Sequence, residues 1–259
     1  MKNMQTSKQK NLIKSGDIFM LGDHYLCCGN CTDTELVKRL LGNNKIKLIL
    51  VDVPYGVSFT RSKESLLKKR TKHKDIVGDE DQSDEKYSLF TQQWLTAIKP
   101  YLERKNAFYI FNSDKMIFAL KQGIENAGYN FGQLLIWVKS QAVIGRKDYL
   151  PMHELIAYGW SGVHEFMKSK AKSVLFYPKP QNNKLHPTMK PISLLRDLIL
   201  NSTRIGDVVY DGFVGSGSTI LSCEQTKRKC FAFEIDPEYC QIIIDRFEKF
   251  TNIKPKKLT

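Results

Sequence analysis

Residues 208–220, with the sequence VVYDGFVGSGSTI, decide the fold predicted for this chain. The apolar run before Asp211 predicts a buried strand, the glycines after it predict a tight turn, and a helical pattern begins at Ser218. Doubly wound sheets bind cofactors with this succession of strand, glycine-rich turn and helix, at the carboxyl ends of their strands. The stretch therefore predicts an α/β protein with a cofactor at this turn.

The same stretch limits the kind of cofactor. A nicotinamide-dinucleotide fingerprint needs a third glycine where this chain has Ile220, and the Gly-Lys-Ser/Thr of a P-loop is absent. The next apolar run is followed by Glu234, whose carboxylate can accept two hydrogen bonds from ribose hydroxyls. A ribose-bearing cofactor that needs no phosphate cradle fits this pattern. A tight turn followed by a helix-capping acid is the alternative that these residues alone leave open.

The rest of the chain alternates between strand-like and helix-like patterns. Short β-branched or aromatic runs predict buried strands, and segments with helical apolar periodicity predict helices between them. This alternation predicts a doubly wound, mostly parallel, Rossmann-like sheet that makes residues 1–259 one domain. The predicted strands are 46–51, 107–111, 134–138, 155–158, 208–210 and 230–233, and the predicted helices are 33–41, 86–102, 114–127, 191–202, 218–226 and 237–250.

Charge and composition narrow the class of protein. The 259 residues include 40 Lys and Arg against 27 Asp and Glu, a formal net charge of +13, and most of the excess lies in residues 57–74 and 161–184. Charge alone allows nucleic acid, an anionic membrane surface or a solvated face. An apolar share of 42% excludes a disordered polyelectrolyte, and no apolar run is long enough to span a membrane. Residues 1–16 contain no apolar export signal, so we expect a cytoplasmic protein.

The six cysteines follow no metal-binding pattern. Cys28 and Cys31 have CxxC spacing, but no second pair and no pair of histidines follows at a zinc-finger distance. We predict buried, reduced cysteines and no metal site.

Two further motifs accompany the glycine-rich stretch. Residues 49–56, ILVDVPYG, place Asp52 and Tyr55 after an apolar strand, although such a segment alone can be a plain turn. Residues 186–191 read HPTMKP. Together, D-x-P-Y-G, H-P-T-x-K-P and D-x-F-x-G-x-G-x-T resemble the motifs of DNA amino-methyltransferases that use S-adenosylmethionine. Their order resembles the β group of that family, a circular permutation in which the catalytic motif precedes the cofactor motif. The resemblance covers about residues 21–247.

This resemblance implies a reaction in which a methyl group passes from S-adenosylmethionine to adenine N6 of a base flipped out of double-stranded DNA. The adenine amine is a poor nucleophile because its lone pair is delocalised into the ring. By resemblance, Asp52 and the backbone carbonyl of Val53 accept hydrogen bonds from the amine. Pro54 holds Val53 extended, and Tyr55 stacks on the base. Asp at position 52 favours adenine, whereas cytosine-N4 enzymes of the group more often have Ser there, so cytosine N4 is the alternative target.

Two positions depart from the family pattern. Val53 stands where proline is commonest, which removes a restriction on Asp52 but keeps the backbone carbonyl. Asn30 stands where an aspartate contacts the adenine of the cofactor, so a carboxylate charge is lost. These departures predict lower efficiency and weaker cofactor binding. They also leave open a catalytically impaired, DNA-binding homologue.

The resemblance also assigns binding residues. A mobile basic loop, about residues 57–80, follows the catalytic motif, and a small target-recognition insertion, about residues 161–185, precedes the HPTMKP motif. The expected cofactor-binding residues are Asn30, Asp52, His186, Thr188, Lys190, Asp211, Phe213, Gly215, Ser216, Gly217, Thr219, Glu234 and Ile235. The expected DNA-binding residues are Arg61, Lys63, Lys68, Lys69, Arg70, Lys72, Lys168, Lys170 and Lys172.

Weaker family patterns and partners complete these expectations. Trp137 with Lys139, and His153 with Glu154, resemble patterns near the target pocket, but we favour a core tryptophan and a structural His–Glu pair. Homodimers are common in the group. Some members accompany a cognate restriction endonuclease, and a DNA substrate implies association with the nucleoid.

Overall fold

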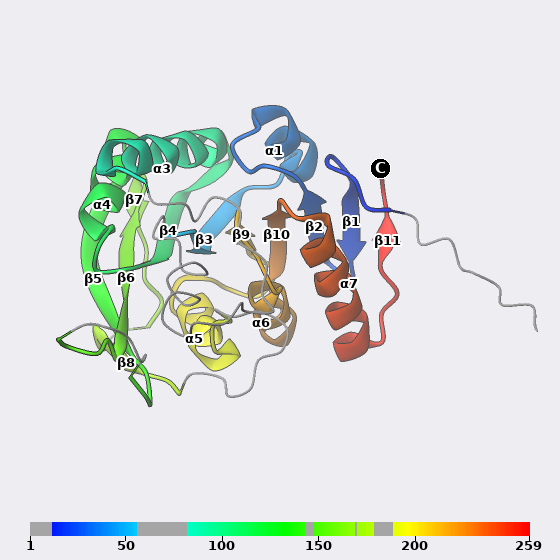
Figure 1. Cartoon of the computed structure of the whole chain (residues 1–259). Helices are drawn as coiled ribbons and strands as arrows, with labels where there is room; N and C mark the ends of the chain where they lie inside the picture. The colour runs from blue at the N-terminus through cyan, green and yellow to red at the C-terminus, as the bar shows by residue number, and fades with distance from the viewer. Residues whose placement is uncertain (1–11, 56–81, 143–147, 169, 179–188) are drawn as a thin grey trace, which may run out of the picture.

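A computed structural model describes residues 12–55, 82–142, 148–168, 170–178 and 189–259 (Figure 1). Its helices are α1 (Thr34–Leu41), α3 (Asp84–Ile98), α4 (Ile117–Asn126), α5 (Ile192–Ser202), α6 (Ser218–Thr226) and α7 (Pro237–Thr251), with a 3-10 turn η1 (Lys99–Tyr101). Its strands are β1 (Ile18–Leu21), β2 (His24–Cys28), β3 (Ile46–Asp52), β4 (Leu102–Asn112), β5 (Asn130–Val138), β6 (His153–Trp160), β7 (Val163–His164), β8 (Val174–Phe176), β9 (Val208–Asp211), β10 (Lys229–Glu234) and β11 (Lys256–Lys257).

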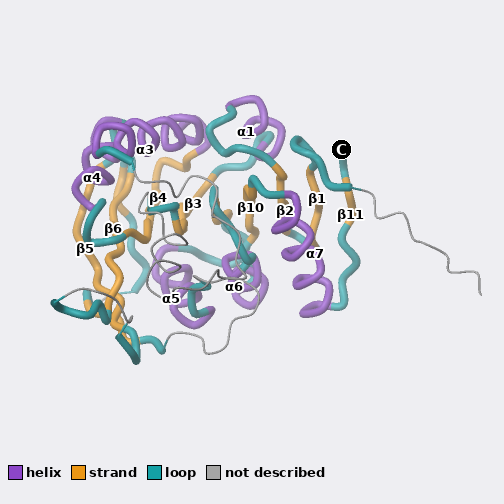
Figure 2. Tube along the Cα trace, viewed as in Figure 1, coloured by secondary structure: helices purple, strands orange, loops and turns teal. Residues whose placement is uncertain are grey.

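The strands form one sheet in the order β11-β1-β2-β10-β9-β3-β4-β6-β5-β8, with β7 beside β4. The central strands β2, β10, β9, β3 and β4 are parallel to their neighbours in that group. Antiparallel strands flank them, β1 beside β2 and β6 beside β4. Figure 2 shows the strands in orange between helices in purple. The predicted α/β fold with a mostly parallel sheet is confirmed.

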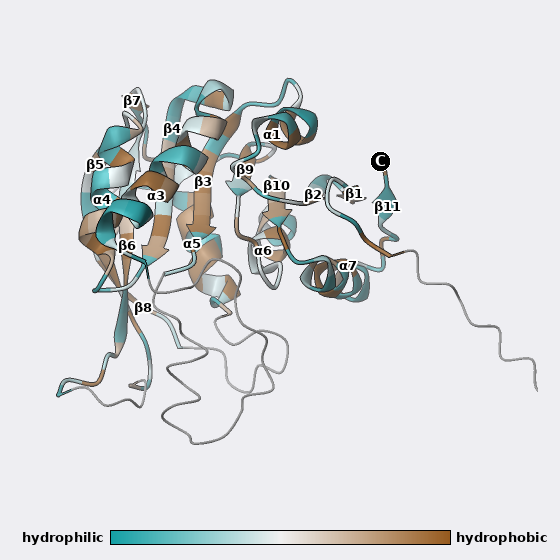
Figure 3. Ribbon diagram, turned by 45° about the horizontal axis from the view of Figure 1, so that its top comes forward, coloured by the Kyte–Doolittle hydropathy of each residue, from teal (hydrophilic) through white to brown (hydrophobic). Residues whose placement is uncertain are grey.

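Helices cover both faces of this sheet. Leu48 and Leu50 of β3 pack in one core with side chains of α5, α6 and α7, whereas Ile49 and Val51 pack in a second core with α1, α3 and α4. Successive side chains of a strand point to opposite faces, so a strand buried on both faces reads as a continuous apolar run. Figure 1 shows the two groups of helices on opposite sides of the sheet, and Figure 3 shows the hydrophobic strands between them.

Local signals set most helix boundaries. Asp33 accepts hydrogen bonds from the backbone of Glu35 and Leu36 and so begins α1, and Asp236 caps α7 in the same way, with Pro237 at its first position. The helix predicted over 86–102 is corrected: α3 runs from Asp84 to Ile98 because Ser83 caps its start, and the chain then turns through η1, which contains Pro100.

Several shorter elements were not predicted. The strands β1, β2 and β11 form one edge of the sheet, and β7 and β8 lie within the predicted insertion of about residues 161–185. Val174 of β8 pairs with Ile136 of β5, so this part of the insertion extends the sheet. The predicted basic loop of about residues 57–80 lies outside the described residues.

The strand register brings three acidic residues to one edge of the sheet. Ile49 of β3 lies opposite Tyr210 of β9, and Ala232 of β10 lies opposite Asp211. These strands are parallel, so Asp52, Asp211 and Glu234 stand at the carboxyl ends of three neighbouring strands. Ligands of doubly wound sheets bind outside this edge.

The described residues contain no helix that is both long and apolar enough to cross a membrane. All six cysteines are buried and free of disulfide bonds. In the described parts of the chain, no three His, Cys, Asp or Glu side chains gather closely enough to hold a metal ion.

Candidate active site

Asp52, the last residue of β3, lies among buried charged side chains. Its Oδ2 atom is 2.5 Å from Nζ of Lys190, and its Oδ1 atom is 3.0 Å from the hydroxyl oxygen of Tyr55. The Lys190 side chain is only 5% exposed and that of Asp52 is 26% exposed. The Lys190 ammonium also lies 5.1 Å from the ring centre of Phe111 on β4. Asp52 therefore has a charged partner on one oxygen and a neutral partner on the other.

A second carboxylate and a second ammonium complete this group. Glu154 lies near the start of β6, and Lys139 directly follows β5, so both reach the same edge of the sheet. The Oε1 atom of Glu154 is 2.7 Å from Nζ of Lys139, and its Oε2 atom is 3.1 Å from Nζ of Lys190. The Tyr55 hydroxyl lies 3.0 Å from the same Oε2 atom. We call Asp52, Tyr55, Lys139, Glu154 and Lys190 the charge cluster.

Lysine partners decide the ionisation of the charge cluster. Burial opposes the charge of Glu154, but the Lys190 and Lys139 ammonium groups more than compensate and lower its pKa to about 2. Burial also raises the pKa of Asp52 above its ordinary value, and the Lys190 ammonium opposes this effect. The two carboxylates raise the pKa of Lys190 despite its burial. Glu154 is thus ionised between two lysine ammonium groups, whereas burial opposes the charge of Asp52.

The glycine-rich turn lies next to the charge cluster. Asp211 accepts a hydrogen bond of 3.0 Å from the backbone of Phe213 with its Oδ1 atom. Glu234 accepts hydrogen bonds from the backbone of Gly215, at 3.0 Å, and of Asp236, at 2.9 Å. Gly217 has a φ of +80°, and a Cβ atom there would lie 3.1 Å from Ile243 of α7. Glycine is therefore required at the point where the turn enters α6.

Neither acidic residue of the turn has a lysine or arginine partner among its described hydrogen bonds. Burial raises the pKa of Asp211 to about 7, and hydrogen bonds from Thr219 and Phe213 only partly oppose this effect. Burial likewise raises the pKa of Glu234 to about 7, against the backbone hydrogen bonds that it accepts. Both carboxyl groups therefore change charge near neutral pH.

The other predicted cofactor residues have diverse surroundings. Ser216 and Thr219 are buried at the start of α6, and Phe213 packs edge-on against Trp94 of α3. Asn30 is exposed, and its side-chain oxygen accepts a hydrogen bond from the backbone of Thr32. Ile235 is 44% exposed beside Glu234. His186 and Thr188 lie outside the described residues, whereas Lys190 contacts Asp52.

The catalytic motif and the basic residues are only partly described. Val53 is buried in the core on the α1, α3 and α4 side, and Pro54 is half-buried. Lys168, Lys170 and Lys172 are exposed in the segment before β8. The remaining predicted DNA-binding residues, Arg61, Lys63, Lys68, Lys69, Arg70 and Lys72, lie outside the described residues.

Lys139 and Glu154 were not among the predicted site residues. Trp137 is a core side chain, as expected, but the structural His153–Glu154 pair is wrong. Neighbouring residues of a strand point to opposite faces, so His153 is exposed while Glu154 contacts the two lysines. Their position was a usable signal, because Lys139 follows one predicted strand and Glu154 precedes the next.

The fold and this edge define an α/β protein with a glycine-rich turn at the carboxyl ends of its strands, the place where doubly wound sheets bind cofactors. The chain belongs to the DNA methylase family, whose model matches residues 46–245. Type II methyltransferase M.HpaI of Haemophilus parainfluenzae is 26% identical, over 89% of this chain and 76% of the relative.

Two solved structures resemble the fold. The M1.HpyAVI–SAM complex has a TM-score of 0.62 at 22% identity, over 85% of this chain and 98% of the other. The PvuII DNA methyltransferase (cytosine-N4-specific) has a TM-score of 0.66 at 17% identity, over 88% and 89%.

S-adenosylmethionine is the cofactor of this family, and the turn fits it. Gly212 leaves no free space for a side chain, because a Cβ atom there would lie 3.2 Å from the Tyr210 hydroxyl and 3.3 Å from Cys31. Gly215 has a φ of +53°, which favours glycine. Glu234 places a buried carboxylate beside this turn, and a carboxylate is a group that can accept hydrogen bonds from ribose hydroxyls. The chain is thus an S-adenosylmethionine-dependent DNA methyltransferase.

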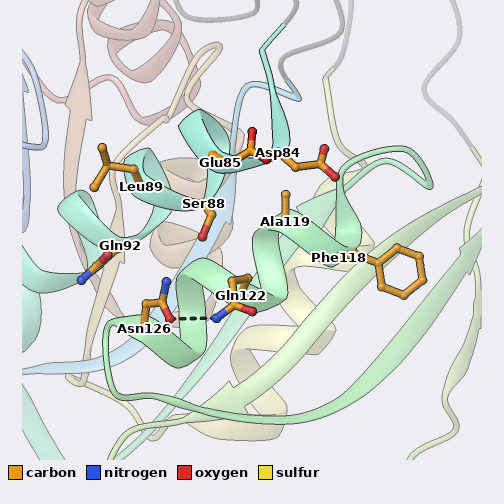
Figure 4. A pocket seen from close by; sticks show the side chains of 9 residues that line it. All are labelled: Asp84, Glu85, Ser88, Leu89, Gln92, Phe118, Ala119, Gln122 and Asn126. Atoms are coloured by element: carbon orange, nitrogen blue, oxygen red, sulfur yellow. Dashed lines mark hydrogen bonds between the residues drawn. The ribbon is translucent and has the colours of Figure 1, made fainter.

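A separate cleft lies between α3 and α4 (Figure 4). Asp84, Ser88 and Gln92 line it from α3, and Phe118 and Gln122 line it from α4. None of its lining residues belongs to the charge cluster or to the glycine-rich turn.

Proposed function

We propose that this protein methylates adenine N6 in double-stranded DNA and that Asp52 accepts a hydrogen bond from the target amine. The observation that carries the proposal is the Asp52 carboxylate at the carboxyl end of β3, one strand away from Asp211 and the glycine-rich turn. An acceptor on the amine draws the nitrogen lone pair out of the ring and toward the methyl donor. The reaction then depends mainly on positioning.

The remaining roles concern the catalytic motif and the cofactor. When bound, S-adenosylmethionine supplies an electrophilic methyl group. The backbone carbonyl of Val53 is proposed as the second acceptor for the amine, and Pro54 keeps Val53 extended. Tyr55 is proposed to stack on the flipped base. Its hydroxyl now lies between Asp52 and Glu154, so stacking requires it to leave at least one of these carboxylates.

Cytosine N4 is the second candidate target, supported by the fold likeness to the cytosine-N4-specific PvuII enzyme. Labelled S-adenosylmethionine, mixed-sequence DNA and digestion to nucleosides separate the candidates. We expect label in N6-methyladenosine. Label in N4-methylcytidine would replace our proposal with the alternative, and DNA binding without any label would indicate the impaired homologue.

Asp52→Ala tests the amine acceptor. We expect methylation to fall by about 100-fold or more, because the amine loses its side-chain acceptor. Asp23→Asn, on the turn between β1 and β2, is the matched control and keeps wild-type activity. Full activity of Asp52→Ala would show that another group activates the amine.

We also propose that the exposed lysines before β8 bind DNA phosphates, together with the basic residues of the loop of about 57–80. Lys168, Lys170 and Lys172 are exposed in the segment proposed for target recognition. Each phosphate contact contributes about 0.9 to the slope of log affinity against log salt. Replacing all three lysines with alanine should therefore reduce this slope, measured by fluorescence anisotropy. An unchanged slope would remove these lysines from the DNA interface.

We further propose that residues 1–259 form one catalytic domain that works in the cytoplasm beside the nucleoid. The family model spans most of the sheet and both helical layers, which supports a single catalytic unit.

A further inference from the structure

The two oxygens of Asp52 have unequal partners. Oδ2 faces the Lys190 ammonium at 2.5 Å, whereas Oδ1 faces the Tyr55 hydroxyl at 3.0 Å. An ammonium paired with a carboxylate in a buried site is costly to remove, because an unpaired charge remains. A neutral hydroxyl can be exchanged for another hydrogen-bond donor at small cost. An incoming amine can therefore replace Tyr55 more readily than Lys190.

Glu154 anchors the ammonium that faces Oδ2. Its Oε2 atom lies 3.1 Å from Nζ of Lys190, and its Oε1 atom lies 2.7 Å from Nζ of Lys139. The Glu154 side chain is 18% exposed, and both lysines are almost completely buried. Lys139 thus pairs with one oxygen of Glu154, and Lys190 pairs with the other.

We propose that Glu154, balanced by Lys139, is a positioning residue that fixes the Lys190 ammonium on Oδ2 of Asp52, which leaves Oδ1 to receive the target amine in place of the Tyr55 hydroxyl. This inference rests on the proposed role of Asp52 as amine acceptor. It adds two residues to the reaction without placing either on the substrate. It also assigns Lys190 a role beside Asp52, the proposed amine acceptor.

Glu154→Gln tests this role through both rate and pH dependence. Displacement of a positioned group lowers kcat by about 10- to 100-fold in such sites. The acidic limb of the kcat/KM profile gives the more specific result. The charged groups around Asp52 are Lys190, Glu154 and, from β9, Asp211, with Lys139 beyond Glu154.

The direction of the pH shift separates positioning from simple charge removal. Loss of the Glu154 charge alone would lower the pKa of Asp52 and move the acidic limb to lower pH. If Glu154 holds Lys190 in place, its loss also withdraws the ammonium, and the limb moves to higher pH. Lys190→Met removes the ammonium completely, so its acidic limb shows the shift to higher pH that withdrawal of Lys190 produces. A shift of Glu154→Gln to lower pH, or none, would overturn the positioning role.

A double variant controls for folding. Glu154→Gln leaves Lys139 buried without a carboxylate, whereas Lys139→Met with Glu154→Gln leaves the remaining Asp52 and Lys190 charges balanced. We expect this double variant to recover the thermal stability of the wild type but to keep the low kcat of Glu154→Gln. Recovery of wild-type kcat would show that Glu154 only balances charge.

Tyr55→Phe tests the assignment of Oδ1. This variant keeps the ring for stacking and removes the hydroxyl that competes with the amine for Oδ1, so we expect the KM for DNA to fall by about threefold; an unchanged or higher KM would show that the hydroxyl does not compete for Oδ1. Loss of activity would show that the hydroxyl takes part in turnover. The proposed function has its own tests: it is wrong if Asp52→Ala stays active or if the wild type transfers no label to adenine. If Asp52→Ala is inactive while Glu154→Gln matches the wild type, only the positioning role fails.

Discussion

Two pairs of buried acids stand at the same edge of the sheet and are stabilised in different ways. Asp52 and Glu154 share the ammonium group of Lys190, whereas Asp211 and Glu234 accept hydrogen bonds from backbone N–H groups of the glycine-rich turn. The pKa of Glu154 falls to about 2, but that of Glu234 rises to about 7. Backbone hydrogen bonds do not offset burial at Glu234, and the single Lys190 ammonium does not offset it at Asp52, whose pKa stays raised, whereas the two ammonium groups beside Glu154 more than offset it.

This difference gives Glu154 and the two acids beside the glycine-rich turn opposite effects on stability as pH changes. Glu154 has a lowered pKa, so its contribution is present above 4.5 and is lost as pH falls toward 2. Asp211 and Glu234 have raised pKa values, so they favour the folded state below their ordinary values and this contribution is lost as pH rises through about 7. Glu154 therefore keeps its charge at neutral pH, whereas Asp211 and Glu234 change their charge close to it.

Of the substitutions that test this comparison, Lys190→Met should have the largest effect, a loss in the free energy of unfolding. The substitution leaves Asp52 without an ammonium partner, and breaking a buried pair costs about 3 kcal/mol at the lower end of the usual range. We place the effect at that end because the Asp52 side chain is 26% exposed. Urea unfolding at pH 7.5 measures the loss. Lys121→Met, which removes a pair exposed on the surface of α4, should change the free energy of unfolding by less than about 0.5 kcal/mol. Equal losses in the two variants would show that burial does not set the strength of the Lys190 pair.

The structural elements that could be predicted from the sequence are those that a single local pattern determines. The apolar run before Asp211, the glycines after it and the helix start at Ser218 predicted β9, the turn and α6, and the structure has α6 over the same residues. Residues 49–56 and 208–220 likewise predicted that Asp52 and Asp211 lie at strand ends, because a change from apolar to polar residues marks the end of a strand.

The charge cluster could not be derived in the same way. Lys139, Glu154 and Lys190 are distant in sequence and meet only because β5 and β6 pair antiparallel while β6 joins the parallel strands through β4. Sequence periodicity predicts a strand but does not give its neighbour or its direction. The isolated lysine and glutamate therefore formed only weak patterns. The short strands β1 and β2, inside the edge strand β11, had too few residues for a clear pattern.

Asp211→Asn should stabilise the protein, by less than Lys190→Met destabilises it. Asn removes a charge that burial disfavours, so the free energy of unfolding at pH 8 should rise by about 2 kcal/mol. The shift of the Asp211 pKa from 3.8 to about 7 would give more, but Asn accepts the Phe213 and Thr219 hydrogen bonds less strongly than a carboxylate. The gain should be nearly absent at pH 4 and should level off above about pH 7. Asp23→Asn is the control, and a destabilised Asp211→Asn at pH 8 would contradict the comparison.

Glu234→Gln should have the smallest effect, and it concerns cofactor binding. If the Glu234 carboxylate accepts hydrogen bonds from the ribose, protonation near pH 7 removes that acceptor. The Kd of the wild type for S-adenosylmethionine should then rise by about tenfold between pH 8 and pH 6, because one protonation changes affinity by at most tenfold per pH unit. Isothermal titration calorimetry should give a weaker and much flatter dependence for Glu234→Gln, whereas Glu35→Gln on α1 should keep the wild-type slope. A wild-type Kd that is equal at pH 6 and pH 8 would show that the glycine-rich side of the edge holds the cofactor without using the charge of Glu234, and the contrast between the two acid pairs would then concern stability alone.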